Sequence, residues 1–88
     1  MADAIRQYEQ LLERVMAAKP DIERDVGEAY SLSLLYLDLA RLRRAAGVPD
    51  AADALAAKTR AMWSCWNQSR PNNPFMLRQL AAVDDRAR

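Results

Sequence analysis

The feature that most constrains this chain is an apolar run that covers almost the whole circumference of a helix. Its members fall within 32–42 and are Leu32, Leu34, Leu35, Tyr36, Leu37, Leu39, Ala40 and Leu42. A helix that is apolar all round must be contacted on more than one side. We therefore expect the segment of about 21–46 to be the central helix of an all-α domain.

Proline and glycine clusters divide the chain into segments. They lie at 19–21, 47–50 and 70–74, and proline ends helices because it lacks an amide proton and disfavours the helical region for the preceding residue. The apolar spacing between these clusters predicts helices over about 3–18, 21–46, 50–69 and 74–83. No strand pattern is present, and short connections favour antiparallel neighbours. The prediction is an all-α fold of about four antiparallel helices.

Particular residues are expected at the helix ends. Asp21, Asp50 and Asn73 can each act as an N-cap, and Pro74 suits the first helical position after Asn73. Gly47 follows an expected helix where a left-handed C-terminal residue is common. We expect a single helical domain over 1–83 and a polar C-terminal tail over 84–88.

Composition excludes several classes of protein. The chain has 13 Lys and Arg against 12 Asp and Glu, a net charge of +1, whereas electrostatic nucleic-acid binders usually have a basic excess. Its single cysteine allows no internal disulfide, which fits a reducing compartment. No window approaches the run of about 20 apolar residues that a membrane span needs. We expect a cytoplasmic protein that binds neither nucleic acid nor membrane.

The sequence offers little for catalysis. Histidine is absent, which removes the commonest general base and the commonest metal ligand. Gly27 and Gly47 are isolated, so no glycine-rich phosphate loop is present, and a zinc site has no Cys/His set. The acidic residues that open the second segment are expected to stay solvated and to stabilise the helix dipole. We predict no enzyme activity, no cofactor and no metal.

The stretch 61–67, AMWSCWN, holds both tryptophans and the only cysteine. Cys65 flanks the apolar stripe of its helix, and we expect it to act as a small hydrophobic residue rather than a reactive thiol. Trp66 continues the line of Leu55 and Met62 and is expected in the core. Trp63 is rotated away from that line. Core packing is favoured for it as well, with a place at a binding edge as the alternative.

The segments alternate in a pattern that resembles the tetratricopeptide repeat (TPR) family. The similarity is best in LYLDLARLRRAAGVPDAADAL, residues 35–55, where Ala40, Gly47 and Ala52 have the family's spacing of small residues. Tyr36 and Leu39 match its large apolar positions. The resemblance implies a stack of helical hairpins in which segments two and four are A helices and segments one and three are B helices. The alternative is a plain four-helix bundle.

The resemblance also implies a binding surface. On a TPR-like A helix, Leu34, Leu37, Arg41 and Arg44 would face the concave groove that binds extended peptides. The two arginines lie one turn apart and could clamp a carboxylate. The alternative for Arg41 is a local pair with Asp38 at i, i+3, worth only a few tenths of a kcal/mol. With Trp63 at the edge, these residues form the expected partner-binding set.

The chain is therefore predicted to be a non-enzymatic protein–protein interaction module. Its partner would be a protein segment or a second copy of itself, because the apolar supply exceeds what one and a half repeats can bury. Self-association would make a homodimer, or the chain would be one end of a larger helical array. The alternative is a small dimeric helical regulator or inhibitor that controls an enzyme partner.

Overall fold

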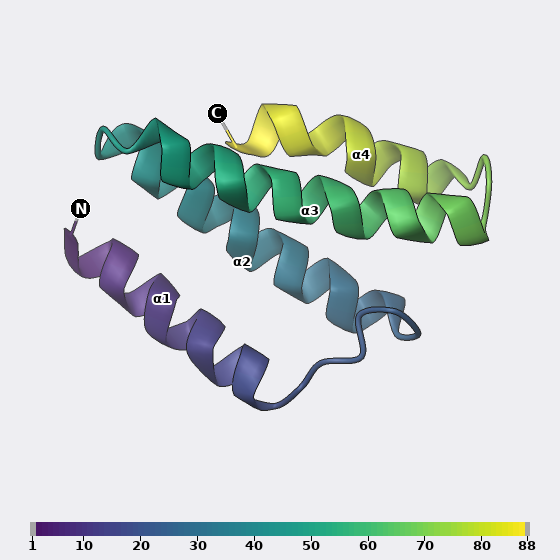
Figure 1. The fold of residues 1–88 in the computed structure, drawn as a ribbon, viewed down its shortest axis with the longest axis horizontal. Coiled ribbons are helices and arrows are strands. Elements are labelled where there is room, and N and C mark those ends of the chain that lie inside the picture. The colour runs from purple at the N-terminus through teal and green to yellow at the C-terminus, as the bar shows by residue number, and fades with distance from the viewer. Residues whose placement is uncertain (1, 88) are drawn as a thin grey trace.

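The chain folds into four sequential α-helices in a computed structural model that describes residues 2–87, with only the backbone described at 84, 86 and 87. They are α1 (Ala2–Ala17), α2 (Val26–Ala45), α3 (Pro49–Ser69) and α4 (Pro74–Ala87). Figure 1 shows successive helices running in opposite directions, so that α2 and α4 point the same way. No strand occurs within 2–87. The predicted all-α class and the helix number are confirmed.

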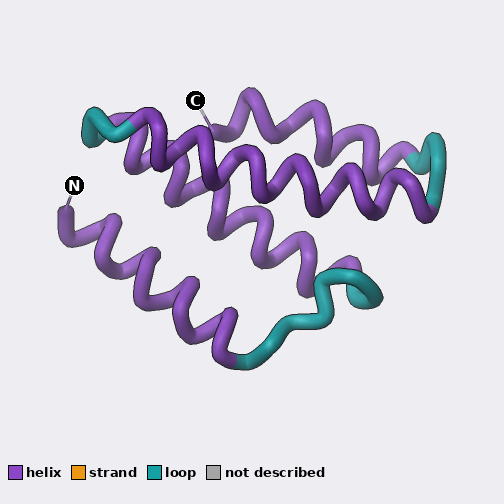
Figure 2. The backbone as a smooth tube through the Cα atoms, viewed as in Figure 1, coloured by secondary structure: helices purple, strands orange, loops and turns teal. Residues whose placement is uncertain are grey.

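Two of the predicted helix boundaries differ from those observed. α4 continues through 84–87, so four of the five residues expected as a polar tail are helical, and residue 88 lies outside the described range. α2 begins at Val26 rather than near 21, and the connection drawn in Figure 2 between α1 and α2 covers 18–25. The Asp25 carboxylate caps α2, accepting from the backbone amides of Gly27 at 2.9 Å and Glu28 at 3.2 Å.

The residues before α2 make other hydrogen bonds than those of a helix. In a helix beginning at 21, the Ile22 carbonyl would accept the amide of Val26. Instead it accepts the indole Nε1–H of Trp66, on α3, at 2.7 Å. Asp21, the expected cap, accepts the amide of Asp25 through its backbone carbonyl at 2.8 Å, so 21–25 forms a turn. The prediction that Asp21 caps the helix is wrong because this turn precedes it.

The other helix ends follow the sequence more closely. Gly47 has φ = 85°, and the amides of Gly47 and Val48 donate to the carbonyls of Arg44 and Arg43, the hydrogen-bond pattern of a Schellman motif. Asn73 caps α4 by accepting the amide of Phe75 at 2.9 Å, with Pro74 first in the helix. α3 has no side-chain cap.

The predicted cap at Asp50 is wrong because Pro49 already opens α3. Asp50 therefore lies inside the first turn of the helix, where its charge suits the dipole.

The core lies between α2, α3 and α4. Ala29, Leu32, Leu37, Ala40, Ala52, Met62, Trp63, Trp66, Met76 and Val83 form one buried cluster. α1 contributes no buried residue and packs Leu12 and Val15 against the edge of this cluster. It approaches α2 only, while α4 approaches both α2 and α3. The first and last helices therefore do not meet, and they lie on opposite sides of the array in Figure 1.

The result is a flat, open arrangement. The Cα atoms span 38 × 27 × 15 Å, with a radius of gyration of 13.0 Å. A compact chain of this length is expected near 12 Å. The accessible surface is 5700 Å² for a 9.9 kDa chain, against about 5200 Å² expected for a folded monomer of this mass. The fold leaves more surface in water than a closed domain of its size.

Candidate functional site

Two of the predicted site residues line one groove. It lies between the parallel helices α2 and α4 and has a volume of about 420 Å³. It is lined by Tyr30, Ser33, Leu34 and Leu37 from α2 and by Arg78, Gln79, Ala81, Ala82 and Asp85 from α4. The floor is closed, since Leu37 is 3% exposed and Ser33 is buried with its hydroxyl donating to the Tyr30 carbonyl at 2.8 Å. Leu34 is half-buried and remains available from the groove.

The two arginines of the predicted clamp diverge. Arg41 stays exposed and lies 3.7 Å from Asp38, the local i, i+3 pair that was the alternative for it. Arg44 turns toward α3, where its guanidinium meets the Asp53 carboxylate at 2.6 Å. Residues three apart on a helix are rotated by about 60° around its axis, and α3 supplies an acid on the side where Arg44 lies. The predicted two-arginine clamp on one groove is therefore wrong.

Trp63 belongs to the core. Its side chain is 1% exposed, and its ring meets Phe75 of α4 edge-on, with 5.8 Å between centroids and an interplanar angle of 77°. The expectation that Trp63 binds a partner is wrong for this fold, because α4 covers the side of α3 on which it lies. Core packing, the role that the sequence favoured for both tryptophans, is confirmed for Trp63 and also for Trp66, which is 7% exposed.

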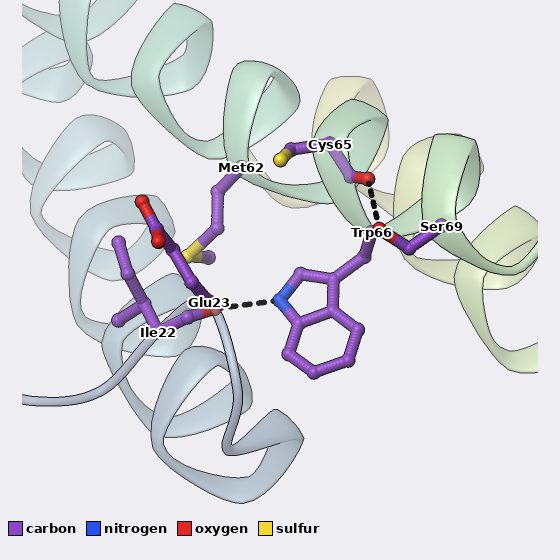
Figure 3. Close-up of a pocket in the computed structure, with 6 residues that line it drawn as sticks. All are labelled: Ile22, Glu23, Met62, Cys65, Trp66 and Ser69. Atoms are coloured by element: carbon purple, nitrogen blue, oxygen red, sulfur yellow. Dashed lines mark hydrogen bonds between the residues drawn. The ribbon is translucent and has the colours of Figure 1, made fainter.

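A small pocket lies beside Trp66, between the connection to α2 and the last turns of α3. Figure 3 shows its six lining residues: Ile22, Glu23, Met62, Cys65, Trp66 and Ser69. Its volume of about 200 Å³ is below the roughly 300 Å³ at which small-molecule sites begin. Cys65 is an exposed free thiol at its edge. Beside the pocket, the Trp66–Ile22 hydrogen bond and the packing of Ile22 against the core join the connection to α3.

Sequence reasoning missed a second groove, between α1 and α3 on the side of α2. It has a volume of about 510 Å³ and an apolar floor that includes Leu12, Leu39 and Leu55. At its rim, Arg43 of α2 forms an ion pair with Glu9 of α1. The pairing of two residues so far apart in the sequence left no local signal. The ion pair links α1 to α2, and it neutralises the charges of Arg43 and Glu9 at the rim of this groove.

The α4 side of the α2/α4 groove was also missed. Arg78 and Asp85 lie seven residues apart on α4 with Ala81 and Ala82 between them. This spacing places charges two turns apart on one face with small residues in the middle, a signal that was readable in the sequence. Most of the predicted partner-binding residues lie on α2, because its long apolar run is the strongest feature of the sequence.

Within the described part of the chain, no cluster of three or more His, Cys, Asp and Glu residues could hold a metal ion. None of the described helices is long and apolar enough to cross a membrane. Burial raises the pKa of the Tyr36 phenol above its ordinary value of 10.0. Comparison of the chain with profiles of known protein families, with curated proteins and with solved structures finds no match.

Proposed function

We propose that this chain is a non-enzymatic, cytoplasmic protein-interaction module of the TPR-like kind, which binds a protein partner in the α2/α4 groove. The observation that carries the proposal is the open groove itself, whose wall at Leu34 is apolar and accessible from solvent. An apolar groove at the edge of an incomplete helical layer is a common docking site for a protein segment. The absence of histidine from the sequence supports the non-enzymatic part.

Packing between the helices supports the repeat-like reading. Ala40 on α2 and Ala52 on α3 are both fully buried, as expected of small residues that let paired helices pack closely. α4 packs against α2 as well as α3, the arrangement that a following A helix would have. The surface excess of about 500 Å² over a closed monomer supports a fold that is completed by another protein surface.

Affinity capture from cell extract with tagged variants tests this proposal. Leu34→Glu places a charge in the groove, and Leu11→Glu makes the same change at a leucine of α1 that is 44% exposed and lies outside the groove. We expect a protein, or an untagged copy of this chain, to be enriched on the wild type and on Leu11→Glu but lost on Leu34→Glu. Equal enrichment on all three folded proteins, as checked by circular dichroism, would contradict the groove as the binding site.

A further inference from the structure

We infer that the partner in the α2/α4 groove is a second copy of this chain, docked through α4 about a twofold axis. The inference rests on the proposed function and names the partner for that same surface. It starts from the charges at the two ends of the groove. Arg78 and Asp85 are both exposed, line the groove and lie about 10.5 Å apart along α4. No ion pair joins either of them to another described residue.

The order of these charges selects one orientation of two α4 helices. When the helices run antiparallel and cross midway between Ala81 and Ala82, Arg78 of each copy faces Asp85 of the other. Two equivalent ion pairs result, as an interface between identical surfaces requires. A parallel arrangement would place Arg78 beside Arg78 and Asp85 beside Asp85, which is repulsive. The pattern is self-complementary in the antiparallel sense only.

The residues at the crossing point permit a close approach. Ala81 is exposed and Ala82 is half-buried, so at the axis the helix surface carries only methyl groups. Small residues let helices approach one another closely and so increase the packed area. Leu77, one turn before Ala81 on the same face, is 45% exposed and would become covered beside the axis. Charged ends with a small, apolar centre match the usual arrangement of an interface core and rim.

A second copy fits the charge balance better than a charged peptide does. The residues that line the groove include one cation, Arg78, and one anion, Asp85. A neutral groove of this kind does not select for a basic or an acidic segment. A stable interface buries about 800 Å² on each partner. An interface of that size extends beyond the groove onto the neighbouring surfaces of α2 and α4.

Charge exchange tests the inference, with mass measured by light scattering and sedimentation equilibrium over a concentration series. We expect the wild type to be a reversible dimer. Arg78→Asp and Asp85→Arg each turn two attractive contacts into two repulsive ones, so each should raise the dissociation constant about tenfold or more. An equimolar mixture of the two variants should form a heterodimer with wild-type affinity, because both contacts become attractive again. The double variant on one chain should regain the homodimer.

Matched controls place the same charge changes outside the groove. Arg6→Asp on α1 and Glu13→Arg at the α1/α3 groove should leave the dissociation constant unchanged. Rescue in the mixture also shows that neither single variant fails through misfolding. A wild type that stays monomeric up to about 1 mM overturns the inference. A dissociation constant of about 1 mM corresponds to a binding free energy of only about −4 kcal/mol. A dimer that ignores the exchanges or does not recover in the mixture also overturns the inference. If capture from extract still depends on Leu34, only the second copy is rejected and the interaction module stands.

Discussion

Trp66→Phe is the substitution whose consequences follow most directly from the structure. The indole fills the end of the core at 7% exposure and donates its Nε1–H to the Ile22 carbonyl at 2.7 Å, the hydrogen bond that fixes the connection between α1 and α2. Phenylalanine keeps most of the ring volume and removes the donor. The substitution therefore separates the hydrogen bond from the bulk of the packing.

The expected loss of stability has two parts. A hydrogen bond of this kind contributes about 1 kcal/mol net. The smaller ring gives up roughly 40 Å² of buried apolar surface, which at 25 cal/mol per Å² is about 1 kcal/mol more. The Ile22 carbonyl faces the pocket drawn in Figure 3, so water can hydrate it and the penalty should not rise much further. We expect the free energy of unfolding to fall by about 2 kcal/mol.

Thermal unfolding followed by far-ultraviolet circular dichroism measures this change. For 88 residues the entropy of unfolding is about 0.18 kcal/mol/K, so Tm should fall by about 11 °C. Trypsin cleavage after Arg24 gives a local readout, which should accelerate because the connection loses its tether. Ser69→Ala, at the rim of the same pocket, is the control and should shift Tm by less than about 3 °C. A Trp66→Phe protein with unchanged Tm and unchanged cleavage would refute the reasoning.

Four further expectations concern stability. Gly47→Ala should cost about 1–2 kcal/mol in urea unfolding, because φ is 85° and no neighbouring atom within 4 Å adds a clash to the backbone strain. Asp25→Ala should cost about 1 kcal/mol in the same assay through loss of the α2 cap. The raised pKa of Tyr36 contributes stability that is present below pH 10.0 and lost as pH rises above it, so Tyr36→Phe should flatten that decline in pH-dependent unfolding. Hydrogen exchange should be fastest in α1 among the helices, since α1 has no buried residue; protection equal to that of α3 would contradict this.

The sequence predicted those features that depend on local chemistry. Gly47 and the Asn73–Pro74 pair mark helix ends because a left-handed residue, a side-chain cap and a missing amide proton act within one turn. The core position of Trp66 followed from its line with Met62 along one helix face. Both kinds of signal lie within a single helix, where spacing alone decides which side chains share a face.

The misassigned residues were decided by contacts with other helices or with a connection, and not by spacing within one helix. The Ile22 carbonyl accepts the indole N–H of Trp66, 44 residues further on, a contact that spacing within one helix does not predict. Arg44 of α2 forms an ion pair with Asp53 of α3, and the ring of Trp63 packs against Phe75 of α4. Periodicity within one helix says how wide its apolar face is. It does not say which of the neighbouring helices covers which part of that face.

The all-round apolar character of α2 connects the fold with the proposed function. Three helices contact α2, yet α1 and α4 do not meet across it, so part of its circumference stays open beside α4. That opening exposes Leu34, whose burial would favour folding if a fifth helix covered it. On the proposed function, the partner covers this half-buried leucine above the closed floor. On our proposal that this partner is a second copy docked through the charges of α4, dimerisation should raise Tm with protein concentration.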